Sequence, residues 1–276
     1  MVFDKEAAFE EAVITVLKQH GWDDADGVLR YPTEQDLIEN WAKILFRNNA
    51  DIDRLNGCPL TQGEMAQVVE QIETLKTPLA LNGFINGKTV AITRDNPDDP
   101  LHLGKEVSLK IYDRQEIAAG QSRYQIAQQP VYPAKSKILN DRRGDLCLLI
   151  NGMPVIHIEL KRSGVPVSQA TGQIEKYAHE GVFTGLFRLV QIFVGMTPDE
   201  ARYFANPGTG AFNPNFFFHW EDFNNEPVCA GDKPGTGEWK RFTSTLLSIP
   251  MAHQLIGFYT VADSSDGCLK VMRSYQ

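Results

Sequence analysis

The sequence is poor in the features that mark secreted and membrane proteins. Its four cysteines, Cys58, Cys147, Cys229 and Cys268, lie far apart and form no CxxC pair, so neither a disulfide framework nor a zinc site is indicated. No apolar run approaches the roughly 18 residues of a membrane helix. The N-terminus carries acids where a signal peptide carries bases and an apolar stretch. We therefore expect a cytoplasmic protein without membrane partners.

Length and composition are those of a globular protein. The 276 residues correspond to roughly 1.8 times the usual 150-residue domain, so one large or two small domains are expected. Hydrophobic residues make up 42% and charged residues 22%, which argues against disordered and fibrous classes.

The formal charge of −8 argues at first against a nucleic-acid partner, because Lys and Arg drive phosphate binding. The acids are concentrated, however: residues 1–100 hold 18 acids and 9 bases, whereas residues 101–276 hold 17 acids and 18 bases. Between 133 and 165 six bases outnumber three acids: Lys135, Lys137, Arg142, Arg143, Lys161 and Arg162 against Asp141, Asp145 and Glu159. Local charge therefore leaves a DNA partner open, and we expect the acidic N-terminal third to face away from it.

Hydrophobic periodicity predicts a helical N-terminal third followed by strands. Apolar residues recur at helical spacing over 9–17, and capping residues begin helices after Thr33 and Thr61. Strands are expected at 88–95, 106–113, 123–133, 145–150, 154–161, 189–196 and 201–206, with a helix over 167–179 and a last helical stretch over about 240–258. This order predicts an α/β or α+β layered core.

One segment resembles a phosphate-binding P-loop but fails its spacing. Three residues separate Gly83 from Gly87, where the P-loop needs four, and a strand rather than a helix follows. We interpret both Asn-Gly pairs as turns that tolerate positive φ, and predict no nucleotide site.

The segment 143–161 contains the candidate catalytic acids. Two apolar strands flank an Asn151-Gly152 turn, and each carries an acid, Asp145 or Glu159, that is costly to bury without a cation. A plain two-residue turn would place Asp145 opposite Ile158, on the wrong face. Convergence of the acids therefore requires an odd loop of three or five residues, or a β-bulge.

Two converging carboxylates can bind Mg²⁺, and Lys161, on the same strand face as Glu159, can position a water or stabilise negative charge. The structural alternative is that Asp145 ends a turn and that Glu159 and Lys161 form a solvated pair. Gln173 and Tyr177 share one face of the following helix, which suits contact with phosphate oxygens or an ordinary polar surface.

These residues resemble the PD-(D/E)xK nuclease pattern. The sequence DLCLLINGMPVIHIELK, followed by the Gln-x-x-x-Tyr helix, is similar to that of type I restriction enzyme R (HsdR) subunits. Gly144 departs from the pattern, which has Pro there. The resemblance implies a restriction-endonuclease-like core, a mixed central sheet flanked by helices, with a helical N-terminal elaboration. It implies an endonuclease domain over 1–260, with a helical part over 1–85 and a nuclease core over about 86–205. Residues 261–276 would begin the connection to an absent helicase motor.

The resemblance also implies roles for particular residues. Asp145 and Glu159 would bind Mg²⁺ with the Leu160 carbonyl as a third ligand, and Lys161 would assist the attacking water. An acid of the first helix, Glu10 or its competitor Glu11, would complete the metal shell. The DNA-binding residues would be Gln173, Tyr177, Arg143 and Arg162. We interpret Cys147 and His157 as packing residues, with a supporting role for His157 left open.

The implied function is hydrolysis of phosphodiester bonds in unmodified double-stranded DNA, without base specificity of its own. The full-length protein would couple it to ATP-dependent translocation and work with methylation and specificity subunits. Two alternatives stay open: a non-catalytic docking module of a DNA translocase, and a nuclease of another restriction or repair system.

Overall fold

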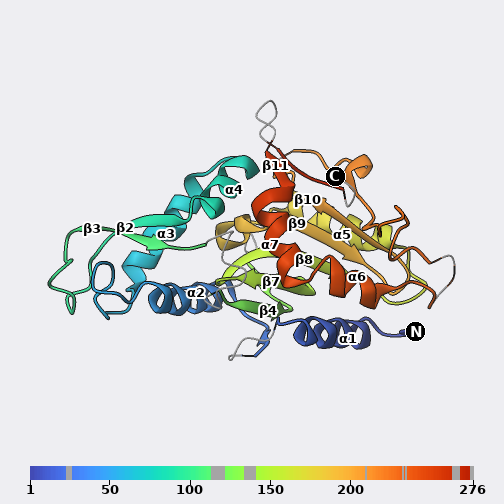
Figure 1. Ribbon diagram of the computed structural model, residues 1–276, viewed down its shortest axis with the longest axis horizontal. Helices are drawn as coiled ribbons and strands as arrows, with labels where there is room; N and C mark the ends of the chain where they lie inside the picture. The colour runs from blue at the N-terminus through green and yellow to red at the C-terminus, as the bar shows by residue number, and fades with distance from the viewer. Residues whose placement is uncertain are drawn as a thin grey trace.

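A six-stranded mixed sheet forms the centre of the protein (Figure 1). The computed structural model describes residues 1–22, 27–112, 122–133, 141–208, 210–231, 233, 235–262 and 268–273. The sheet order is β1-β4-β7-β8-β9-β10. Its strands are β1 (Leu29–Arg30), β4 (Tyr124–Gln128), β7 (Leu146–Ile150), β8 (Met153–Leu160), β9 (Ile192–Met196) and β10 (Ala201–Ala205). The pairs β1–β4 and β8–β9 are parallel, and the other pairs are antiparallel.

The helices that flank the sheet come from distant parts of the chain. Helix α5 (Val167–Glu180) packs on β8, β9 and β10, while α1 (Glu6–Gln19) contacts β8 and α6 (Trp239–Thr245). Rings of Phe3, Phe9 and Trp239 meet where α1 and α6 touch, with centroids 5.1 to 5.7 Å apart. Helix α5 lies so close to β9 that a Cβ on Gly195 would come 2.8 Å from the Thr171 methyl. The predicted mixed sheet flanked by helices is thereby confirmed.

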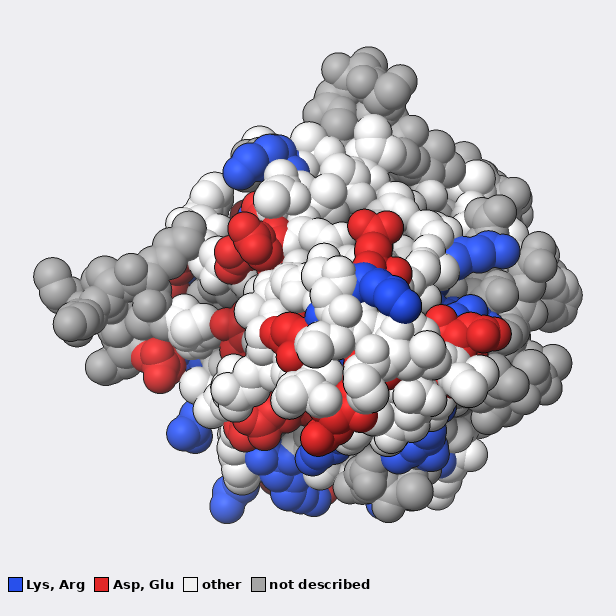
Figure 2. All heavy atoms as spheres, turned by 90° about the vertical axis from the view of Figure 1, so that its left-hand side faces the viewer, with Lys and Arg blue, Asp and Glu red and all other residues white. Residues whose placement is uncertain are grey.

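A helical lobe lies beside the sheet, at the left of Figure 1. It contains α2 (Glu34–Asn48), α3 (Gln62–Thr74), α4 (Pro78–Asn86) and the hairpin of β2 (Thr89–Thr93) and β3 (Glu106–Lys110). Thr33 and Thr61 each form the predicted cap, since each hydroxyl accepts the backbone N–H three residues on. Acidic and basic side chains are interspersed on the face that Figure 2 shows, without a continuous basic surface.

A buried charge network holds this lobe together. The guanidinium of Arg94 lies 2.7 Å from the Glu64 carboxylate and 3.2 Å from the Asp99 carboxylate, and all three side chains are fully buried. Each of the two buried carboxylates lies against the Arg94 guanidinium, so every charge in this group has an opposite partner.

One local prediction was wrong, and two predicted elements are present but divided. Gly83 lies inside α4 rather than in a turn, and Gly87 has φ −67°, so the positive φ falls on Lys88 instead. The last helical stretch is split into α6, α7 (Ile249–Gln254) and a π-helical turn (Leu255–Tyr259), because Pro250 begins a new helix. The predicted strand 123–133 consists of β4 and β5 (Val131–Tyr132), and β5 pairs with β6 (Arg142–Arg143).

The described part of the C-terminal segment packs on the core. Strands β11 (Thr260–Ala262) and β12 (Leu269–Val271) pair, β12 contacts β10, and the Tyr203 hydroxyl donates to the Met272 carbonyl at 2.9 Å. The predicted boundary at residue 260 stays a prediction, and Lys135 and Lys137 lie outside the described residues. Among the described residues, no helix has the length and apolar character needed to cross a membrane.

Candidate active site

A β-bulge brings the two acids of the hairpin opposite each other. The Asn151-Gly152 turn has two residues, with φ of 51° and 84°, and Ile150 pairs with Met153. The register then shifts between Leu148 and Leu149, so that Leu146 pairs with Ile158 and Asp145 comes level with Glu159. The bulge that the sequence required is therefore present, in place of a longer loop.

Hydrogen bonds fix the three central residues. The Leu160 N–H donates to the Asp145 carboxylate at 2.6 Å. Lys161 Nζ lies 3.3 Å from the Glu159 carboxylate and donates to the Leu160 carbonyl at 2.8 Å. Glu159 Oε2 is buried and has no hydrogen-bond partner among the described residues. This oxygen, which lies 3.5 Å from His157 Nε2, is therefore able to accept a further contact.

The electrostatics of the pair follow from burial and like charge. Burial, with repulsion from Glu159, raises the pKa of Asp145 to about 8. Burial raises the pKa of Glu159 to about 7, although the Lys161 ammonium opposes this shift. Burial lowers the pKa of Lys161, but the facing carboxylates outweigh it and the net shift is upward. Without a cation the site therefore resists full ionisation, and perturbed carboxyl groups of this kind cluster at functional sites.

Helix α1 contributes further acids. Glu10 is 4% exposed and accepts hydrogen bonds from the side-chain amides of Gln128 and Gln129. Burial raises its pKa, with a contribution from the Asp145 charge. Glu11, in contrast, is exposed and pairs with Arg30 at 3.1 Å. Of the two competing acids, Glu10 is thus the one that faces the site.

The donor set fits a hard cation only in part. Asp145, Glu159 and the Leu160 carbonyl offer oxygen ligands in one place, as Mg²⁺ prefers. Among the described residues, however, no three His, Cys, Asp or Glu side chains lie close enough together to hold a metal. Glu10 therefore stays a predicted ligand that would need to move toward the pair, or act through water.

Helix α5 lines an open depression beside the acids. Its wall contains Lys161, Arg142, Gln169, Gly172, Gln173, Lys176 and Tyr177. The Gln173 amide donates to the Tyr177 hydroxyl at 2.7 Å, and that hydroxyl donates to the Arg143 carbonyl at 2.8 Å. Burial, with repulsion from Glu159, raises the pKa of Tyr177 to about 12. The two predicted helix residues and Lys161 therefore share one surface.

The two predicted arginines lie outside this depression. Arg143 is exposed and its guanidinium lies 5.7 Å from the centre of the Tyr31 ring. Arg162 is exposed and donates to the Ser163 carbonyl at 3.3 Å. Arg142 lines the depression instead, in a two-point ion pair with Glu180. Arg143 and Arg162 stay predicted DNA contacts, but neither lines the depression.

Comparison with known proteins places these features in a family. The family described as "Type I restriction enzyme R protein N terminus" (HSDR_N) matches residues 4–212. The chain belongs to this family. This R-protein N-terminal domain is 29% identical over 276 residues to the "Type I restriction enzyme SsaAORF53P endonuclease subunit" of Staphylococcus saprophyticus, covering 100% of the chain and 26% of that protein. It is 34% identical over 137 residues to the "Type I restriction enzyme EcoprrI endonuclease subunit" of Escherichia coli, covering 49% of the chain and 41% of that protein.

A third relative, the "Type I restriction enzyme SauMSSORF170P endonuclease subunit" of Staphylococcus aureus, is 26% identical over 280 residues, covering 100% of the chain and 26% of the relative. The chain thus spans about a quarter of the length of the first-ranked curated relatives it matches. The predicted family and restriction-endonuclease-like fold are confirmed by these matches and by the mixed sheet.

Several residues around the site of this R-protein N-terminal domain were not predicted from the sequence. Glu6 lies one helical turn before Glu10, and its carboxylate is 3.6 Å from Lys161 Nζ. Its i, i+4 spacing from Glu10 on a predicted helix was the available signal. Gln128 and Gln129 could not be found that way, because only the pairing of β4 with β7 brings them to the site.

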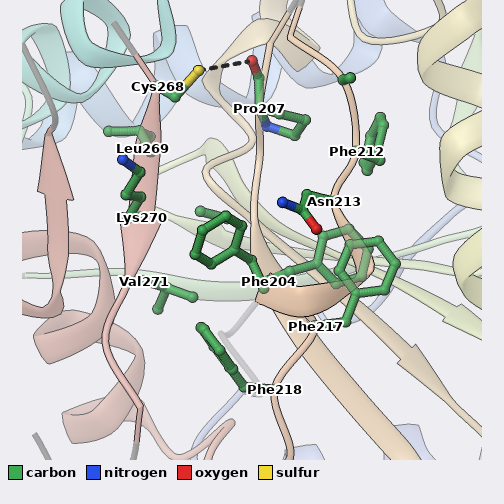
Figure 3. Close-up of a pocket in the computed structure, with 13 residues that line it drawn as sticks. Phe204, Pro207, Phe212, Asn213, Phe217, Phe218, Cys268, Leu269, Lys270 and Val271 are labelled. Atoms are coloured by element: carbon green, nitrogen blue, oxygen red, sulfur yellow. Dashed lines mark hydrogen bonds between the residues drawn. The ribbon is translucent and has the colours of Figure 1, made fainter. Parts of the chain in front are cut away.

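A second cavity lies apart from the acids (Figure 3). It is lined by the aromatic stretch 212–218, by Phe204 on β10 and by Leu269, Lys270 and Val271 on β12. Figure 3 shows Phe204, Phe217 and Phe218 at one end and the contact of Cys268 with the Pro207 carbonyl at the other. None of its lining residues is a carboxylate, so it offers no comparable site for a cation.

Proposed function

We propose that this chain is the Mg²⁺-dependent endonuclease domain of a type I restriction system and hydrolyses phosphodiester bonds of double-stranded DNA. The observation that carries the proposal is the bulged hairpin, which sets the Asp145 and Glu159 carboxylates opposite each other with Lys161 beside them. Endonuclease subunits among the relatives support the same class of reaction.

Each residue has a defined part in this proposal. Asp145, Glu159 and the Leu160 carbonyl would hold Mg²⁺, which, when bound, polarises the scissile phosphate and favours ionisation of a bound water. Glu10 would complete the shell directly or through water. Lys161 would release the Leu160 carbonyl, hold the attacking water and offset the charge that develops on phosphorus oxygens.

The depression along α5 would receive the DNA backbone. Gln173 and Tyr177 present an amide and a phenol, which bond phosphate oxygens without reading base identity, so cleavage would be independent of sequence. Arg143 and Arg162 would contact neighbouring phosphates. In the full-length protein we propose that ATP-driven translocation, with methylation and specificity subunits, selects where cleavage occurs.

Lys161→Ala in the intact subunit is the decisive test. We expect plasmid nicking with Mg²⁺ to fall by roughly 10²- to 10⁴-fold, the range for loss of a group that acts in the transition state. Lys43→Ala on α2, in the helical lobe, is the matched control and should retain the wild-type rate. Calorimetric titration of the chain with Mg²⁺ supplies a readout that does not depend on cleavage. Wild-type nicking by Lys161→Ala, or no Mg²⁺ binding, would instead favour a docking module.

A further inference from the structure

A buried tyrosine and histidine lie directly behind Glu159. The Tyr132 hydroxyl is 2.8 Å from His157 Nδ1, and His157 Nε2 is 3.5 Å from Glu159 Oε2. Among the described residues, neither His157 Nε2 nor Glu159 Oε2 has a hydrogen-bond partner, and both side chains are essentially inaccessible. Buried polar groups are nearly always hydrogen-bonded. Two buried polar atoms without partners, only 3.5 Å apart, therefore require an explanation.

The chemistry of the two rings decides where the imidazole proton lies. Burial raises the pKa of Tyr132 well above its usual range, so its hydroxyl stays protonated. The Tyr132 hydroxyl lies 2.8 Å from Nδ1 and Glu159 Oε2 lies 3.5 Å from Nε2, so each nitrogen of the imidazole ring has one polar neighbour. If the Tyr132 hydroxyl donates to Nδ1, the imidazole proton must be on Nε2, the nitrogen that lies 3.5 Å from the Glu159 carboxylate. With Glu159 ionised, the other tautomer would leave the Nε2 lone pair facing a carboxylate oxygen in a buried site.

We infer that Tyr132 and His157 form a relay of fixed hydrogen bonds that orients the Glu159 carboxylate for metal binding. His157 is a positioning residue in this inference, and it touches neither the substrate nor the metal. The sequence had left such a role open beside simple packing. The inference rests on the proposed function, since a precise carboxylate orientation matters only if Glu159 is a ligand. Mutation of groups that orient metal ligands in this way typically costs roughly 10- to 100-fold in metal affinity or activity.

The packing around the pair supports a dedicated role. A Cβ on Gly144 would lie 2.7 Å from His157 Cε1 and 2.8 Å from the Tyr132 hydroxyl, so no side chain fits at that position. This explains why glycine stands where the PD-(D/E)xK pattern has proline. The rings of Phe183 and Phe193 flank the imidazole, with centroids 5.3 and 6.0 Å away, and restrict its rotation. The relay is therefore held rigidly from three sides.

Two substitutions of His157 separate a relay from packing. A glutamine at this position can place its side-chain amide near the position of Nε2, whereas the shorter asparagine reaches only the position of Nδ1. We expect His157→Gln to keep Mg²⁺ affinity near the wild-type value in calorimetric titration. His157→Asn should weaken it by roughly 10- to 100-fold. Equal loss in both variants, at equal melting temperature, would mean that His157 only fills space.

Imidazole ¹⁵N NMR of the metal-free chain at pH 9, where Glu159 is ionised, tests the tautomer without any activity. We expect a protonated Nε2 and an unprotonated Nδ1 on His157, because the two nitrogens differ strongly in chemical shift. Tyr132→Phe removes the donor and keeps the ring, so the proton should become shared between the two nitrogens. A proton on Nδ1 in the wild-type chain would overturn the relay. That result leaves the proposed nuclease untouched, whereas wild-type nicking by Lys161→Ala overturns the nuclease but not the tautomer.

Discussion

The pair of Asp145, which is partly buried, and Glu159, which is fully buried, predicts that the metal-free chain loses stability as the pH rises. Both carboxyls have pKa values raised in the folded state, Asp145 from 3.8 to about 8 and Glu159 from 4.5 to about 7. Between the unfolded and folded values, the folded chain retains protons that the unfolded chain has released. Stability therefore falls with pH through that window, roughly pH 4 to 8.

Asp145→Asn removes the larger of the two shifts. A pKa that moves from 3.8 to about 8 corresponds to about 6 kcal/mol at most, at about 1.4 kcal/mol for each pH unit. Part of this is lost in the variant, because the neutral amide gives up the attraction of Lys161 and binds the Leu160 N–H less strongly. We expect a net gain of about 2 kcal/mol at pH 9, and none at pH 4, where the wild-type carboxyl is protonated.

Urea unfolding of both chains at pH 4, 6 and 9 in the presence of EDTA measures this difference. Mg²⁺ should then stabilise the wild type at pH 9 and leave Asp145→Asn nearly unchanged, because only the ion-binding chain gains from mass action. Glu70→Gln, at an exposed position of α3, is the control and should give a difference that does not depend on pH. An Asp145→Asn chain less stable than the wild type at pH 9 would refute the reasoning.

Two further substitutions test the packing that supports the site. Gly195→Ala should destabilise the fold by about 1–3 kcal/mol and reduce DNA cleavage, because its methyl group would push α5 off the sheet. A Cβ on Gly172, which lies on α5, would meet no atom within 4 Å. Gly172→Ala should therefore be neutral or slightly stabilising when both variants are unfolded in urea. Arg94→Met should cost about 3–5 kcal/mol in urea unfolding, because Glu64 and Asp99 remain buried without their cation. A loss below about 1 kcal/mol would mean that water reaches these acids.

Local patterns predicted most elements of the fold, and failed where tertiary packing decides. The capping boxes at Thr33 and Thr61 fix two helix starts from four residues each, and both are present. The Asn82-Gly83 pair looked like a turn, but apolar residues on α4 contact the core and override the low helix propensity of glycine. Short strands such as β1 pair with distant partners, and two residues carry too little periodicity to reveal that.

The candidate site was predictable to the extent that it depends on alternation along strands. Asp145, Glu159 and Lys161 were found because acids interrupt aliphatic strands, and the need for a bulge followed from counting residues around the turn. Which acid of α1 faces the site could not be decided that way. Glu10 and Glu11 are neighbours in sequence, and only the packed position of α1 turns one inward and leaves the other paired with Arg30.

Part of the acidic excess of the N-terminal third, the acids of α1, has a physical explanation. We expected that third to face away from DNA except at Glu10, but two acids of α1, Glu6 and Glu10, lie beside Lys161 and Asp145. Their negative charge repels phosphate, yet it would also raise the affinity of the proposed metal site for a divalent cation. Because a bound cation reverses the local sign, the acids that argue against DNA in a net-charge count are compatible with a phosphate substrate once the metal is present.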